Sequence, residues 1–219
     1  MLYLYAFVRE SADVPDATGV GPARLELIPL GTVAAVVAEV EGAVEPTDEN
    51  VLAHAHVIDA LAAANDAVLP VRFGRGFRDP DELESAVARV EGELEGRLNE
   101  VSGCVEIGLH VAAPVQPPQP AGSGRDYMRD RLRDLARADA LAADIHAPLA
   151  ERARAATRSR SVGTTALLRA AYLVPAADVD SFRAAVDDAQ HRRSELSFAC
   201  TGPWPPYSFA VLEREGAAA

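Results

Sequence analysis

Three arginines lie three residues apart around a short glycine-containing turn, at Arg72, Arg75 and Arg78. Guanidinium groups are well suited to binding an anion such as a phosphate or a carboxylate. The Gly-Arg-Gly spacing of the turn is too short for a dinucleotide-binding fingerprint, which needs further glycines at the start of a helix. In a chain with 33 acidic residues, the favoured interpretation is that these arginines pair with the protein's own carboxylates.

Two histidines, His54 and His56, are the next candidates for chemistry, because histidine is a common metal ligand. Residues two apart on a helix point about 200° away from each other, so the two rings do not converge on one ion. His54 falls on the helical stripe of Val51 and Ile58, which predicts a histidine at the edge of the core. Its single expected hydrogen bond would go to Asn65 or to the arginine segment, whereas His56 would be exposed.

The remaining residues offer no catalytic arrangement. The chain contains no lysine for a phosphate-binding loop, and it has no Gly-x-Ser-x-Gly turn to present a nucleophile. The histidines and the two cysteines lack the short paired spacings of zinc sites. Cys104 and Cys200 each lie in an apolar stretch, and the sequence leaves open whether they pair. We therefore expect a protein that is not an enzyme and has neither a cofactor nor a metal site.

Residues 200–209 are the most constrained stretch of the chain, because they hold three of the 15 prolines and the only tryptophan. Proline fixes the backbone torsion φ and limits the residue before it to extended conformations. A backbone this stiff holds its aromatic side chains in fixed positions. The favoured interpretation is a rigid corner with Trp204 buried in the core, and the alternative is a displayed pair, Trp204 and Tyr207, that binds another protein.

The elements that must position these residues predict an α+β chain of two domains, joined by a proline- and glycine-rich connection at residues 114–124. Residues 1–113 are predicted to form a mixed or antiparallel sheet with two helices. Pro70 cannot donate a ladder hydrogen bond, so its strand is predicted to be short or at an edge. The expected elements of this domain are strands at 2–8, 25–30, 32–40, 68–73 and 101–113, and helices at 47–66 and 80–100.

Residues 125–219 are predicted to form the second α+β domain, which begins with a long helix at Arg125. Apolar residues at three- and four-residue steps mark one seam of this helix, and packing on its own sheet is the favoured role of that seam. Pro148 is expected to bend or restart the helix. Strands at 157–162 and 165–174, a helix at 178–193 and a strand at 195–199 predict a ferredoxin-like ββαβ part, with a last short strand at 209–212. The seam residues are Met128, Leu132, Leu135, Ala142, Ile145 and Leu149.

The charge of the chain limits its partners. A net charge of −12 disfavours nucleic acid and anionic membranes, since both bind positive surfaces. The first apolar stretch ends at Arg9 with no basic segment before it, and no stretch is long enough to span a membrane. We therefore expect a cytoplasmic protein that acts through contacts with other proteins.

The string Gly-Pro-Trp-Pro-Pro-Tyr-Ser-Phe at residues 202–209 resembles the gas vesicle protein F/L family (GvpF/GvpL). Three further segments are similar to this family in the same order: the opening strand, Leu-Pro-Val-Arg-Phe-Gly at 69–74, and Gly-Arg-Asp-Tyr at 124–127. His54 also coincides with a histidine in the family's pattern. One departure is Arg75, where the family commonly has threonine.

This resemblance implies an accessory protein of gas vesicle formation that binds the hydrophobic shell subunit or other accessory proteins. A place as a minor component of the vesicle wall, on its gas-facing side in some members, is equally allowed, and the F-like or L-like label stays open. The alternative function is a regulatory module that binds a small ligand or nucleotide at residues 72–78. The residues that the resemblance implies for protein contacts or for structure are His54, Pro70, Arg72, Phe73, Gly74, Arg125, Tyr127, Gly202, Pro203, Trp204, Pro205, Pro206, Tyr207 and Phe209.

Overall fold

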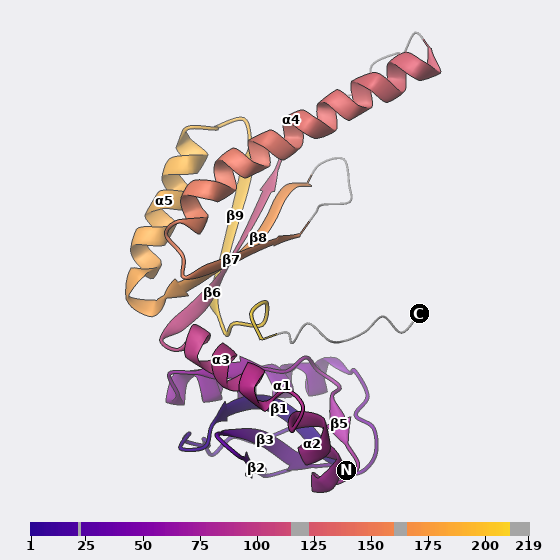
Figure 1. The fold of residues 1–219 in the computed structure, drawn as a ribbon, viewed down its shortest axis with the longest axis vertical. Helices are drawn as coiled ribbons and strands as arrows, with labels where there is room; N and C mark the ends of the chain where they lie inside the picture. The colour runs from indigo at the N-terminus through magenta and orange to yellow at the C-terminus, as the bar shows by residue number, and fades with distance from the viewer. Residues whose placement is uncertain (22, 115–122, 160–165, 211–219) are drawn as a thin grey trace. The chain divides into compact units, whose positions relative to one another are not determined.

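The computed structural model describes residues 1–21, 23–114, 123–159 and 166–210, and Figure 1 shows the course of the chain. The chain divides into two compact units. The first unit consists of Met1–Val105 together with the segment from Trp204 onward, and the second consists of Glu106–Pro203. The predicted α+β class is confirmed, because each unit combines an antiparallel or ferredoxin-like sheet with helices.

The sheet of the first unit is antiparallel, with strand order β2-β3-β1-β4, and β5 also pairs with β1. The predicted hairpin is present, with Leu30 opposite Val33 and Gly31 at a φ of 73° that favours glycine. The elements are β1 (Leu2–Arg9), β2 (Leu25–Leu30), β3 (Val33–Glu39), α1 (Asp48–Ala64), β4 (Val68–Pro70), β5 (Gly76–Phe77), α2 (Pro80–Val87) and α3 (Glu91–Val101).

Strand β1 is the centre of this unit, because it is buried at every position from Leu2 to Val8. A strand buried on both faces needs cover on both sides of the sheet. On one side, Tyr3, Tyr5 and Val8 share a core with apolar residues of α1. Helix α3 contacts β1, β3 and β4, and its inward side chains are buried as well.

The ends of the helices in the first unit follow local sequence signals. The Thr47 hydroxyl accepts a hydrogen bond from the Asn50 N–H at 3.3 Å, as its position before the helix predicts. Asp79 caps α2 in the same way, with Pro80 in the first turn. The single helix predicted at 80–100 is wrong, because the backbone at Val90 has a φ of −130° and separates α2 from α3. The described residues of the first unit therefore form three helices rather than two.

The second unit follows the order β-α-β-β-α-β, with strands in the order β7-β8-β6-β9. The predicted ferredoxin-like ββαβ part is present, and β6 and α4 complete it. The elements are β6 (Cys104–Ala112), α4 (Gly124–Ala150), β7 (Ala155–Ser159), β8 (Ala166–Pro175), the short 3-10 helix η1 (Ala176–Asp178), α5 (Val179–His191) and β9 (Ser197–Trp204). Helix α4 continues through Pro148, which lies in its last turn, where a missing N–H removes a single ladder bond.

The compact units differ from the predicted division at 1–113, 114–124 and 125–219. Strand β6, predicted to end the first domain, lies between β8 and β9 in the second sheet, where Ile107, Leu109 and Val111 join the second core. The segment from Trp204 returns to the first unit. A strand whose apolar and polar residues alternate can pair in either sheet, so this pattern alone does not show which sheet it joins. Most of the predicted connection and part of the predicted strands at 157–162 and 209–212 lie outside the described residues.

Candidate functional site

A chain of hydrogen bonds joins three segments of the first unit at His54, which is only 3% exposed. Its Nε2 lies 3.0 Å from the Val71 carbonyl oxygen, and its Nδ1 lies 3.0 Å from the Tyr3 hydroxyl. A carbonyl can only accept, so Nε2–H donates to Val71, and Nδ1 accepts from the Tyr3 O–H. The same hydroxyl oxygen accepts the Gly74 N–H at 3.1 Å. With neutral His54, every polar group in this chain of hydrogen bonds therefore has a partner.

Aromatic rings enclose this hydrogen-bond chain. His54 stacks on Tyr5 with ring centroids 5.4 Å apart, and Phe73 meets His54 edge-on at 5.8 Å. His54 thus makes two hydrogen bonds instead of the one predicted, and it lies inside the core rather than at its edge. The predicted alternative partner, Asn65, instead bonds to Asp13 and to the end of α1. The histidine and the Leu-Pro-Val-Arg-Phe-Gly segment therefore form one structural junction.

The junction is expected to make stability depend on pH. Burial lowers the pKa of His54 below its usual value, and burial raises the pKa of Tyr3 to about 12. The unfolded chain binds a proton near pH 6.5, whereas folded His54 does so only at lower pH. The contribution of neutral His54 to the unfolding free energy is thus complete above pH 6.5, and it is lost as the pH falls towards the pKa of His54 in the folded protein. Chemical denaturation should show that the unfolding free energy declines between pH 7.5 and 5.5, and that this decline is smaller in His54→Gln. An equal decline in both proteins would contradict the role of His54.

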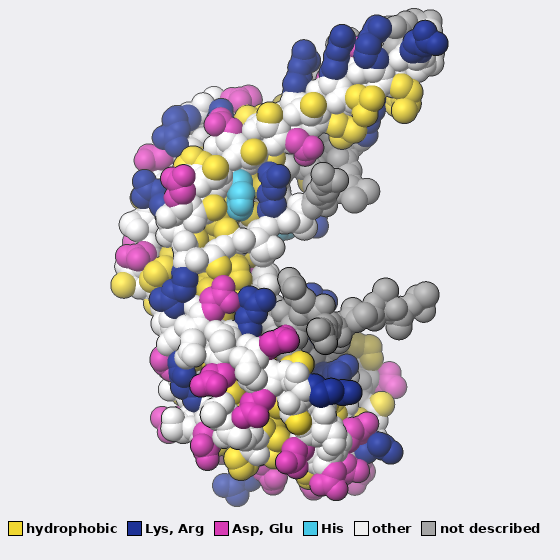
Figure 2. Space-filling model, viewed as in Figure 1, with side chains coloured by type: hydrophobic (Ala, Val, Ile, Leu, Met, Phe, Trp, Pro, Cys, Tyr) yellow, Lys and Arg dark blue, Asp and Glu magenta, His cyan; other side chains and the backbone are white. Residues whose placement is uncertain are grey.

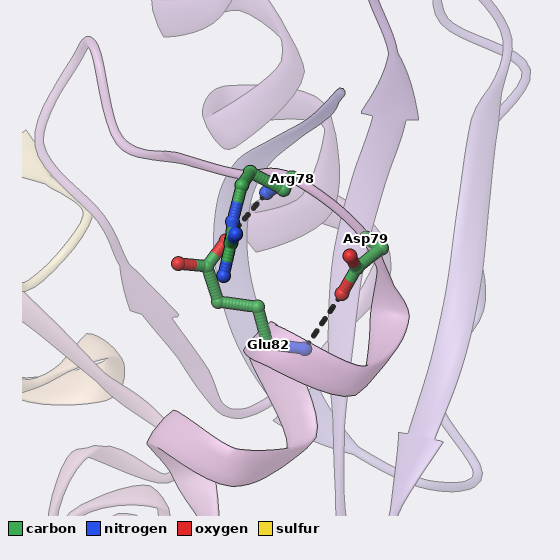
Figure 3. Close-up of polar contacts among 3 residues, drawn as sticks. All are labelled: Arg78, Asp79 and Glu82. Carbon is green, nitrogen blue, oxygen red and sulfur yellow. Dashed lines mark hydrogen bonds and ion pairs between the residues drawn. The ribbon is translucent and has the colours of Figure 1, made fainter.

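The three predicted arginines have different surroundings. Figure 3 shows Arg78 beside Glu82, which accepts from the Arg78 Nε at 3.2 Å and from its backbone N–H at 2.7 Å, while Asp79 caps the helix. These bonds lower the pKa of Glu82. Arg75 lies over the Phe77 ring, 5.5 Å from its centroid. The predicted ion pair is thus confirmed for Arg78.

Arg72 differs from Arg78, because it is exposed and forms no ion pair with any residue that the structure describes. It lines a groove of about 800 Å³ in the first unit, together with several other residues predicted from the sequence. The structure also adds Arg89, which the sequence analysis missed because it stands alone between two helices. The predicted residues that this groove brings together are Pro70, Arg72, Phe73, Gly74 and Tyr207.

The C-terminal proline segment is a corner, but its tryptophan is not buried. The Gly202–Pro203 peptide bond is cis, and the Arg183 guanidinium donates to the Gly202 carbonyl at 2.6 Å. Trp204 is 53% exposed, so the prediction that it fills the core is wrong. The residues that follow take that role, since Pro205, Pro206 and Phe209 are buried and Tyr207 packs against the first core. Burial raises the pKa of Tyr207 to about 12.

Helix α4 has two different halves. The C-terminal half of its seam, Ala142, Ile145 and Leu149, is buried in the second core, which confirms the predicted packing for that half alone. The N-terminal half extends beyond the strands of its own sheet (Figure 1). There the seam residues are exposed, Met128 by 57%, Leu132 by 63% and Leu135 by 49%, and Tyr127 beside them is 55% exposed. Figure 2 shows yellow hydrophobic side chains along one side of this part of the helix and a row of dark blue side chains along the other.

Other kinds of site find no support in the part of the chain that the structure describes. Within it, no cluster of three or more His, Cys, Asp or Glu side chains could hold a metal ion. Cys104 and Cys200 do not form a disulfide with each other. Among the described helices, none combines the length and the apolar character needed to cross a membrane.

Comparison with known proteins identifies the family. The model of the family "Gas vesicle synthesis protein GvpL/GvpF" matches residues 1–211. Gas vesicle protein F1 of Halobacterium salinarum is 27% identical over 96% of this chain and 93% of its own length. Gas vesicle protein L of Streptomyces sp. (strain CB03234) is 34% identical over 74% of this chain and 69% of its own.

Solved structures agree with this fold. The crystal structure of gas vesicle protein GvpF from Anabaena sp. PCC7120 matches with a TM-score of 0.80 at 17% identity, covering 100% of this chain and 99% of that one. GvpF from Microcystis aeruginosa matches with a TM-score of 0.79 at 17% identity, covering 96% and 99%. By its match to the family model over nearly its whole length, the chain belongs to the GvpL/GvpF family of gas vesicle synthesis proteins.

Proposed function

We propose that this protein is a non-enzymatic accessory protein of gas vesicle assembly that binds the hydrophobic shell subunit through the α4 seam, which we define as Tyr127, Met128, Leu132 and Leu135. The proposal rests on one observation, the exposure of all four of these large side chains on a helix whose other half is packed. Exposed apolar patches of this kind usually mark contact surfaces.

The α4 seam has the composition of a protein-binding surface. Tyrosine, methionine and leucine side chains that are half exposed can each contribute on the order of 1 kcal/mol when a partner buries them. Arg133 and Arg137 lie on the opposite side of the helix, where they pair with Asp130 at 3.5 Å and Asp134 at 3.8 Å. The helix can therefore stay in water on one side while its other side covers an apolar partner.

A shell subunit is a suitable occupant, because a protein that buries its apolar faces only in an assembled wall would aggregate while it is free. A strongly acidic chain that covers such a face would keep the complex dispersed through charge repulsion. The gas vesicle is then the expected place of action. A minor position in the vesicle wall, on its gas-facing surface, would use the same contact, because the seam would stay buried against shell subunits.

The test is co-purification of the full chain with a gas vesicle shell subunit, followed by affinity measurement. Leu132→Asp should weaken binding about 30-fold or more, because it places a carboxylate at the centre of an apolar contact. Arg133→Ala is the matched control, since it changes the net charge equally at a residue that pairs with Asp130 and is not part of the α4 seam. Absence of a complex with the unaltered chain, together with normal vesicles in a deletion strain, would refute the proposed function.

A further inference from the structure

A groove in the first unit combines an apolar floor with a positive rim. Its volume is about 800 Å³. Leu4 and Phe7 of β1, Leu69 of β4 and Leu94 of α3 line it, and all four side chains are buried or nearly so. We name it the arginine groove, after the three guanidinium groups at its edge, Arg72, Arg75 and Arg89.

The charge around the groove is opposite to that of the whole chain. Among the residues that the structure describes, no aspartate or glutamate lines it, although the chain carries 33 acidic residues and a net charge of −12. Arg72 and Arg89 form no ion pair with any described residue. The third, Arg75, is placed over the Phe77 ring at the edge of the floor. Charge complementarity therefore indicates an occupant that offers carboxylates beside apolar side chains.

The chemistry of the lining favours a protein segment over a nucleotide. Among the described residues, no buried polar side-chain atom lacks a hydrogen-bond partner. The floor of the groove therefore offers no unpaired side-chain group to bind a base or a sugar. Helix α3 begins after Val90 at the groove, and its first turn carries Glu91 and Glu93, whose carboxylates disfavour an anion at this helix N-terminus. An anion would find arginines only at the rim, whereas an apolar side chain would be buried on the floor.

The geometry of the sheet favours a helix over an added strand. Strand β4, at the end of the order β2-β3-β1-β4, is only three residues long and includes Pro70, which has no N–H to donate. A short edge of this kind gives little ladder for a strand from another chain. An amphipathic helix instead places side chains at three- and four-residue steps into a groove.

We propose that the arginine groove binds an amphipathic helix of a partner protein, whose apolar stripe is flanked by aspartates or glutamates. This deepens the proposed function and rests on it, because it gives the chain a contact surface distinct from the α4 seam and states the chemistry of the partner segment. Arg72 and Arg89 would pair with the flanking carboxylates, and the floor would bury the stripe.

The experiment measures fluorescence anisotropy of a labelled helical peptide with a leucine stripe flanked by glutamates. The full chain should bind this peptide more tightly than the same peptide with glutamines, and the difference should shrink at high salt. Arg72→Gln combined with Arg89→Gln should weaken binding about tenfold. Arg78→Gln is the matched control, because Arg78 pairs with Glu82 and does not line the groove. Ala86→Phe, which fills the groove wall, should also abolish binding in a variant whose melting temperature is unchanged.

Equal affinity for both peptides, or no loss in the double variant, would overturn the proposal. Binding that appears only after removal of residues 211–219 would assign the groove to the chain's own C-terminal segment and overturn it as well. Tighter binding of ATP or inorganic phosphate than of the peptide, lost in the double variant, would assign it to a small anion instead. The peptide assay contains no shell subunit, so its failure leaves the test of Leu132→Asp unaffected.

Discussion

Replacing His54 with alanine is expected to lower the unfolding free energy of the first unit by about 3 kcal/mol. The change removes the ring that packs on Tyr5 and leaves a cavity among aromatic side chains. It also leaves the Tyr3 hydroxyl and the Val71 carbonyl without their partner in the core. Unmade hydrogen bonds of buried groups and lost packing therefore act in the same direction. Chemical denaturation, followed by hydrogen exchange of the amides of β1, measures the loss.

His56→Ala is the matched control for this result, because His56 is exposed two residues away on the same helix. We expect its effect to stay within about 0.5 kcal/mol. Tyr3→Phe keeps the ring and removes only the hydroxyl that accepts from Gly74 and donates to His54, so it should cost about 1–3 kcal/mol. If His54→Ala and His56→Ala had equal effects, the hydrogen-bond chain would not hold this unit together.

Replacing Phe182 with alanine should destabilise the second unit by about 3–5 kcal/mol. Phe182 is 1% exposed, and its ring lies 5.1 Å from that of Tyr172, which is fully buried. Helix α5 holds it against the core that β6, β8 and α4 share. Truncation thus opens a cavity in the middle of the ferredoxin-like fold. Thermal and denaturant unfolding, with hydrogen exchange to locate the change, would measure it.

Trp204→Ala is the matched control for Phe182→Ala, since it also truncates a large aromatic side chain. Its 53% exposure predicts a stability change within about 1 kcal/mol.

We further propose that the two compact units unfold as separate cooperative units. His54→Ala should then lower hydrogen-exchange protection in β1 and β3, and Phe182→Ala in β6 and β8. Equal loss of protection in both units from either variant would show that they unfold together.

The GvpL/GvpF family assignment and the fold together narrow the role of the motif residues. His54 and Phe73 pack in the first core and the Gly74 N–H donates to the Tyr3 hydroxyl there, so we expect these parts of the family pattern to serve folding. Arg72 and Tyr127 are exposed, and we propose that they make contacts outside the chain. A substitution in the first group is expected to reduce the amount of folded protein, and one in the second to reduce partner affinity at unchanged stability.

Several features could be predicted from the sequence because they depend on a few neighbouring residues. Thr47 caps its helix through the adjacent turn, and Gly31 permits the tight hairpin between two apolar strands. The apolar stripe of α4 follows from helical periodicity. The break at Val90 escaped prediction, because neither proline nor glycine marks the interruption at that residue.

Only the tertiary structure decided what each apolar surface packs against. The stripe of α4 is continuous in the sequence, yet Leu149 is buried and Leu132 is 63% exposed, because the sheet beneath the helix ends between them. The alternation of β6 fits two sheets, and long-range pairing placed it in the second. Trp204 and Phe209 have similar apolar character, but only Phe209 is buried. The spacing of apolar residues predicts which face of a helix or strand is apolar. The residues that cover this face lie far away in the sequence, so only the tertiary structure shows them.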